Sequence, residues 1–141
     1  MVNIFFEDTE VLDLNPEFFI SWLSEVVSLE ELELGDLNLI FTSDDYLLGL
    51  NREHLNHDFY TDIITFDYRV AARVSGDLFV SKDMLAFNSK RLSVSFLSEL
   101  HRVVAHGVLH LCGYDDKTAE DKLVMKIKEN GALALIVSRE T

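Results

Sequence analysis

The stretch with the clearest chemical potential is His106–Asp116, which reads HGVLHLCGYDD. Its two histidines are four residues apart, and residues at this spacing lie on the same face of an α-helix. His106 and His110 can therefore direct two imidazole nitrogens toward one point, an arrangement that suits zinc. Gly113 is expected to end the helix, because the residue after a helix C-terminus commonly needs a positive φ.

An acid beyond this turn would complete a set of metal ligands. Asp115 or Asp116 can approach the two histidines once the chain reverses, giving two nitrogens and one carboxylate oxygen. Three protein ligands leave a fourth position for water, as in catalytic zinc sites, whereas four protein ligands indicate a structural site. The alternative is that both histidines are buried and only satisfy hydrogen bonds. The glycine and the acids at these spacings favour the metal site.

The spacing also matches the zinc-protease signature H-E-x-x-H-x-x-G-x-x-H, except at two positions. Gly107 stands in place of the glutamate that acts as the general base, so a peptidase would need a base from elsewhere. A glycine inside a helix also indicates a neighbour packed closely against the backbone. Asp116 stands in place of the third histidine, which is a mild change because zinc accepts carboxylate oxygens. A metallopeptidase-like hydrolase is therefore the second-ranked function.

The stretch resembles the YbeY family of metal-dependent endoribonucleases, whose members typically carry H-G-x-L-H-L-x-G-Y-D-H. This chain matches that pattern at every position except the last, where Asp116 replaces a histidine. Two upstream segments, Leu50–Tyr68 and Ser75–Ser81, are similar to further segments of the family. Glu99 and Met125 also fall where the family has such residues, so the resemblance covers most of residues 45–130.

The resemblance implies an α+β fold and a single-strand-specific endoribonuclease of ribosomal RNA maturation and ribosome quality control. It implies that His106, His110 and Asp116 hold the metal, which is usually zinc, and that Asp115 supports these ligands. Another divalent ion is an alternative here, because Asp116 in place of a histidine favours harder ions such as Mn²⁺ or Mg²⁺. A non-catalytic ribosome-assembly adaptor with a structural metal is a further alternative.

The metal would polarise a phosphoryl oxygen or activate water for phosphodiester hydrolysis. The sequence assigns no general base, and Leu55 stands where the family usually has an arginine. We take Arg52 and His57 as candidates to offset charge on a phosphate, with His54 as a further loop histidine. Aromatic residues near this loop either stack on unpaired bases or belong to the core. They are Phe59, Tyr60, Phe66 and Tyr68.

Charge is distributed unevenly along the chain. Residues 1–50 contain 12 Asp or Glu and no Lys or Arg, and they account for nearly all of the net charge of −13. This balance opposes strong autonomous RNA binding, because phosphate neutralisation by Lys and Arg supplies most non-specific affinity. The acidic half is either a solubilising surface or a docking surface for a basic ribosomal protein or another assembly factor.

Composition favours one globular domain spanning residues 1–141, with 48% hydrophobic and 26% charged residues. Apolar runs fall short of the roughly 18 residues that a membrane helix needs, and the N-terminus lacks the basic region of a signal peptide. We therefore expect a cytoplasmic protein without membrane association. The single cysteine, Cys112, excludes an intrachain disulfide and is expected to be a buried thiol that faces away from the ligands.

Periodicity and capping signals predict the elements that must position the motif. We expect an α+β fold with one small mixed sheet of about four strands, packed by four or five helices. Asn15, Ser43 and Thr118 are the expected helix caps, and Gly35 is expected in a turn. Strands are predicted at 2–7, 36–43, 62–70 and 74–81, and helices at 16–30, 43–55, 81–90, 95–112 and 118–130.

Overall fold

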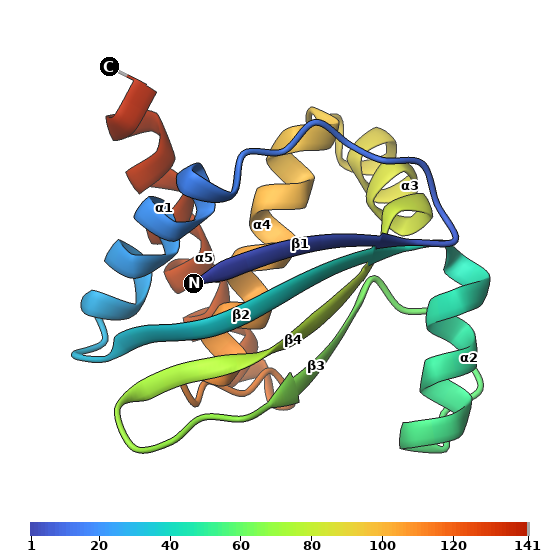
Figure 1. The fold of residues 1–141 in the computed structure, drawn as a ribbon, viewed down its shortest axis with the longest axis horizontal. Coiled ribbons are helices and arrows are strands. Elements are labelled where there is room, and N and C mark those ends of the chain that lie inside the picture. Colours follow the sequence, from blue (N-terminus) through green and yellow to red (C-terminus); the bar gives the residue numbers. More distant parts are fainter. Residues whose placement is uncertain (141) are drawn as a thin grey trace.

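Figure 1 shows the computed structural model, which describes the backbone of residues 1–140 and the side chains of residues 1–137. The strands are β1 (Val2–Glu7), β2 (Glu33–Thr42), β3 (Ile63–Asp67) and β4 (Arg73–Ser81). The helices are α1 (Pro16–Ser28), α2 (Asp44–Leu55), α3 (Lys82–Leu92), α4 (Phe96–Leu111) and α5 (Ala119–Glu140). The expected α+β fold, with a four-stranded mixed sheet and helices interspersed among the strands, is confirmed.

The strands form one sheet in the order β1-β2-β4-β3. β1 pairs with β2 and β2 with β4 in parallel, whereas β3 pairs with β4 antiparallel, as expected for a strand pair close in sequence. α1, α4 and α5 gather on one side of the sheet, while α2 lies apart from them beyond the opposite end of the strands (Figure 1). The core lies between the sheet and this helical layer.

Alternation along the strands explains the two faces of the sheet. In β4 the residues at positions 74, 76, 78 and 80 are buried against the helices, and the intervening residues face the other way. On that second face Asn38 donates from Nδ2 to Oδ1 of Asp77 at 2.9 Å. Phe79 on the same face stacks with Tyr46 of α2, whereas Phe5 of β1 is 48% exposed there.

The expected helix caps are confirmed. The side chain of Asn15 accepts from the backbone N–H of Glu17, and that of Ser43 accepts from the N–H of Tyr46. At the start of α5, the hydroxyl of Thr118 accepts from the N–H of Asp121 at 3.0 Å, while the Asp121 carboxylate accepts from the N–H of Thr118. These reciprocal bonds form the predicted capping box, which fixes where the chain after the histidine motif becomes helical again.

Two expectations about element boundaries are wrong. Gly35 is not in a turn but within β2, at a register shift against β4 where a Cβ would lie 2.8 Å from the carbonyl oxygen of Val74. The glycine is therefore required by close backbone approach. α5 continues through Gly131 instead of ending near residue 130, because Ala132 and Ile136 are buried and the indole N–H of Trp22 donates to the carbonyl of Ala132.

α4 is the central helix, and Gly107 sets its distance from the sheet. A Cβ at this position would lie 2.6 Å from Cδ1 of Ile63 in β3 and 3.1 Å from a methyl carbon of Leu78 in β4. The close neighbour expected from the sequence is therefore the sheet itself. None of the helices within the described residues combines the length and apolar character needed to cross a membrane.

Candidate metal centre

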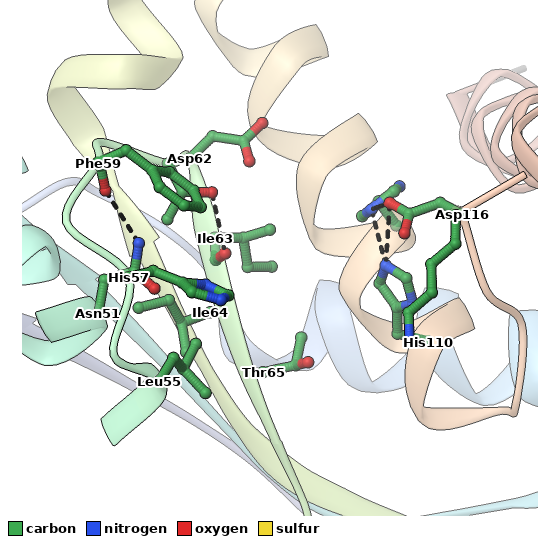
Figure 2. A pocket seen from close by; sticks show the side chains of 13 residues that line it. Asn51, Leu55, His57, Phe59, Asp62, Ile63, Ile64, Thr65, His110 and Asp116 are labelled. Atoms are coloured by element: carbon green, nitrogen blue, oxygen red, sulfur yellow. Dashed lines mark hydrogen bonds and ion pairs between the residues drawn. The ribbon is translucent and has the colours of Figure 1, made fainter. Parts of the chain in front are cut away.

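The C-terminus of α4 turns the chain back toward its own histidines. Gly113 has φ +111°, and its N–H donates to the carbonyl of His110, while the N–H of Tyr114 donates to the carbonyl of Leu109. This pair of bonds is a Schellman motif, the helix ending that glycine favours. The predicted stop at Gly113 is confirmed, and the reversal brings Asp116 back beside the last turn of the helix (Figure 2).

The three predicted ligand atoms converge. Nε2 of His106 lies 2.9 Å from Nε2 of His110, and Oδ2 of Asp116 lies 3.2 Å and 3.4 Å from these two nitrogens. Ligand atoms about 2.0–2.1 Å from a shared tetrahedral ion would be separated by roughly 3.3 Å. The nitrogen, nitrogen and oxygen donor set therefore has the spacing of three corners of such a site, with the fourth corner left for solvent or substrate.

Glu129 of α5 fixes the ring of His106. Its Oε2 lies 2.7 Å from Nδ1 of His106, and because a carboxylate only accepts, Nδ1 carries the proton and Nε2 is left with its lone pair. Oε1 of Glu129 accepts from Arg102 at 2.8 Å. Burial favours the neutral forms of the pair, but these bonds outweigh it, so the pKa of Glu129 is lowered and that of His106 is raised.

The backbone fixes the second histidine. Nδ1 of His110 lies 2.8 Å from the carbonyl oxygen of Tyr114, which can only accept, so Nε2 of His110 also presents a lone pair. The hydroxyl of Tyr114 donates to Glu30 at 2.6 Å, and Lys128 pairs with the same carboxylate at 2.9 Å. Glu30, just after α1, and Lys128, in the middle of α5, thus hold the loop that orients His110.

With both histidine rings neutral, the convergence of two nitrogen lone pairs and a carboxylate oxygen is unfavourable without a cation between them. Further acids surround the group. Burial raises the pKa of Asp62. Burial, followed by the charge of Asp62, raises the pKa of Glu99, which is 4% exposed and whose Oε1 has no hydrogen-bond partner within the described residues. The chemistry of the donor set fits a divalent cation.

A cleft of about 640 Å³ opens over the ligand atoms. His106, His110, Asp116 and Lys117 are all in its lining. Figure 2 shows His110 and Asp116 on one side and the loop that follows α2 on the opposite side, with β3 between them. The other lining residues are Asn51, Leu55, His57, Phe59, Thr61, Asp62, Ile63, Ile64 and Thr65. The cleft therefore has a candidate metal site on one side, an aromatic and apolar group on the other, and a lysine in its lining.

The remaining candidates divide between cleft and surface. His57 lines the cleft, as does Leu55 at the position of the family's usual arginine. Arg52 is outside the lining and forms an ion pair with Asp58, so the cation expected there is not in the cleft. Lys117, which the sequence did not single out, occupies the cleft instead. His54 also lies outside the cleft and contacts Phe66 edge-on.

Two residues next to the ligands are not part of the cluster. Asp115 is exposed and, within the described residues, makes no hydrogen bond to either histidine, so the supporting role implied for it falls to Glu129. Cys112 is half-buried and outside the ligand set, as expected, and burial raises the pKa of its thiol to about 11. A thiol with that pKa is neutral at physiological pH.

A periodic signal could have revealed Glu129 in advance. The buried face of α5 follows Met125, Ala132 and Ile136, and Glu129 falls on the same stripe at helical spacing. An acid on an apolar stripe is unexpected unless it has a buried partner. The sequence could not name that partner, because His106 lies 23 residues away on another helix.

Known proteins resemble this chain over nearly its full length. The family profile described as Endoribonuclease YbeY matches residues 4–136. A protein named Endoribonuclease YbeY from Flavobacterium johnsoniae is 47% identical over 135 residues, covering 96% of each chain. A protein of the same name from Cytophaga hutchinsonii is 44% identical over 136 residues, covering 94% of this chain and 95% of the relative.

The fold comparison agrees. A Thermotoga maritima protein solved in solution superposes with a TM-score of 0.66 at 26% identity, covering 99% of this chain and 93% of the other. The resemblance noted in the histidine motif thus extends through the whole fold. The chain belongs to the YbeY family of endoribonucleases.

Proposed function

We propose that the protein is a metal-dependent endoribonuclease that hydrolyses phosphodiester bonds in unpaired regions of ribosomal RNA during its maturation. The observation that carries this proposal is the convergence of His106 Nε2, His110 Nε2 and Asp116 Oδ2 within 3.4 Å of one another on one side of an open cleft. Family membership supplies the reaction class, because the relatives are named endoribonucleases.

His106, His110 and Asp116 would hold the ion, with zinc as the expected metal because two of the three donors are imidazole nitrogens. The bound ion would supply Lewis-acid assistance to the phosphate and activation of water. The chain's own residues orient the donors: Glu129 and the carbonyl of Tyr114 accept from the two Nδ1 atoms, and this directs both Nε2 atoms at one point. Ligand geometry therefore depends on α5 as well as on the motif.

Other cleft residues have complementary roles in this proposal. The ammonium group of Lys117 attracts the RNA phosphates on the ligand side, and His57 is placed to donate to phosphate from the opposite wall. Asp62 is a cleft carboxylate outside the ligand cluster, and we assign it as the proton acceptor for the attacking water. Its raised pKa suits that role, since a base is most effective when its pKa approaches the working pH.

The acidic half of the chain accounts for recruitment in this proposal. Most of its acids are exposed: Glu7, Asp8, Glu10, Asp13, Glu17, Glu31, Glu33, Asp36 and Asp45. These exposed acids repel free RNA and favour a basic protein. We propose that it docks on a basic ribosomal protein or assembly factor in the cytoplasm, which then delivers unpaired ribosomal RNA to the cleft and links the enzyme to ribosome quality control.

Cleavage of a ribosomal RNA fragment containing one unpaired and one paired segment tests the activity. The wild type with zinc should cut the unpaired segment, and chelator or His110→Ala should abolish cutting. Asp115→Ala, which changes the acid adjacent to a proposed ligand, should retain both metal and activity. Cleavage that persists in His110→Ala would refute this site, and stoichiometric zinc without cleavage would favour the adaptor alternative.

A peptidase receives no support from Gly107, because this position packs against β3 and β4 and offers no base to the cleft. A casein digest with the same preparations checks the point directly. We expect no proteolysis by zinc-loaded wild-type protein under conditions in which it cleaves RNA.

A further inference from the structure

The loop that follows α2 presents an aromatic pair to the cleft. The rings of His57 and Phe59 stack with centroids 5.1 Å apart and an interplanar angle of 21°. Phe59 is 56% exposed although it lines the cleft, so one face of a large apolar ring is left for a ligand. In Figure 2 this pair lies across the cleft from His110 and Asp116.

A buried asparagine fixes this loop. Asn51 is 2% exposed, and its Nδ2 donates to the carbonyl oxygen of Phe59 at 2.9 Å. The backbone carbonyl of Asn51 accepts from the N–H of His57 at 3.1 Å and from the N–H of Asn56, which has φ 54°. Asn51 therefore holds the backbone of both aromatic residues in place, and this lowers the entropic cost of stacking a ligand on the pair.

The other aromatic residues near the loop differ from Phe59. Tyr60 is exposed but outside the cleft, with its hydroxyl donating to Asp45. Phe66 is half-buried, packs edge-on against Phe79 on the sheet and lies outside the cleft lining. Tyr68 is exposed and lies outside the cleft lining. Among the four aromatic candidates from the sequence, Phe59 alone combines an exposed ring with a place in the cleft.

We infer that Phe59, backed by His57, is a stacking subsite for one unpaired nucleobase of the substrate. The occupant follows from the two walls of the cleft: cationic Lys117 and the candidate metal site suit a phosphate, and the aromatic pair suits a flat ring joined to it. A base in a duplex is already stacked on its neighbours, so the subsite selects unpaired strands. This inference rests on the proposed function and names the residue that recognises its substrate.

Equilibrium binding of a short unpaired RNA, followed by fluorescence anisotropy in chelator and low salt, tests the subsite without turnover. Phe59→Ala should weaken binding by about five- to a hundredfold, in line with the loss of one base–aromatic stack. Phe59→Trp should restore it. Phe87→Ala is the matched control, because Phe87 is 61% exposed on α3 and outside the cleft, and it should bind like the wild type.

A set of RNAs, each with one abasic position, supplies the second arm. One abasic position should weaken wild-type binding as much as Phe59→Ala does, and it should cause no further loss in that variant. Equal binding by Phe59→Ala and the wild type, an equal loss in Phe87→Ala, or no measurable wild-type binding would each overturn the inference. Failure of the proposed function is distinguished by the separate cleavage assay, since binding in chelator does not require catalysis.

Discussion

Oε2 of Glu129 in α5 lies 2.7 Å from Nδ1 of His106 in α4, and this contact connects α5 to the ligand cluster. The carboxylate sets the tautomer, raises the basicity of the ring and fixes its orientation. Glu129 is only 9% exposed and also pairs with Arg102, so its own position is constrained. The candidate centre therefore combines the continuous 106–116 motif with a second segment, the middle of α5.

Removing this support should weaken metal binding while leaving the ligands in place. We expect Glu129→Ala to reduce zinc affinity by about 10–100-fold, with a smaller loss in Glu129→Gln, which keeps an acceptor but not the charge. Competition with a chromophoric chelator measures both. Glu120→Ala, an exposed acid in the first turn of the same helix, is the control and should match the wild type. Unchanged affinity in Glu129→Ala would remove Glu129 from the account.

The helix ending at Gly113 should matter for stability and for metal affinity together. An alanine at φ +111° is strained, so Gly113→Ala should lower the free energy of unfolding by about 1–2 kcal/mol and displace the Tyr114 carbonyl that orients His110. Gly49→Ala is the matched control, because Gly49 is in α2 with open space around its Cα, and it should stabilise by about 0.5–1 kcal/mol. Urea unfolding and zinc titration report the two effects, and equal behaviour of the two variants would contradict the argument.

His101 should lower the free energy of unfolding in mild acid relative to neutral pH. Its ring is 9% exposed among Phe18, Phe19 and Trp22, and burial lowers its pKa from 6.5 to about 4. Because the unfolded state binds the proton more tightly, stability present above pH 6.5 is lost as the pH falls toward 4. The loss between pH 7 and pH 5 should be about 2 kcal/mol.

Urea unfolding at several pH values checks this contribution by comparing the wild type with His101→Phe. The variant should lack this part of the decline, since a phenylalanine ring takes no proton. Parallel pH profiles for the two proteins would show that His101 is not neutral and buried as described.

A cation restored to the cleft should strengthen RNA binding. Leu55 lines the cleft and is 43% exposed, so Leu55→Arg can be accommodated without disturbing the core. We expect tighter binding of unpaired RNA, with the slope of log affinity against log salt steeper by about 0.7 if one further phosphate is contacted. Leu55→Gln, which is long and polar without charge, is the control. A salt dependence identical in both variants would exclude a phosphate contact at this position.

Local signals in the sequence were sufficient for much of the site. The spacing of His106 and His110 placed both rings on one helical face, and Gly113 predicted the reversal that returns Asp116. Contacts between distant segments were not predictable, because the same local pattern is compatible with many packings. Glu129 and Lys117 reach the site through the packing of α5 and the path of the loop after α4.

The errors in element boundaries have the same origin. Gly35 has the composition of a turn, but the register of β2 against β4 places it within a strand, where a side chain would meet backbone. Gly131 weakens the helical pattern, but the buried Ala132 and its bond to Trp22 keep α5 helical. In both cases tertiary contacts outweigh the local preference of glycine.

Crystallographic anomalous scattering at the zinc edge, on protein loaded with zinc, tests the central claim most directly. The account predicts one peak about 2.0–2.2 Å from Nε2 of His106, Nε2 of His110 and a carboxylate oxygen of Asp116, absent in crystals of Asp116→Ala or retained there only at reduced occupancy. A peak coordinated by other residues, or its absence from fully loaded wild-type crystals, would contradict the account.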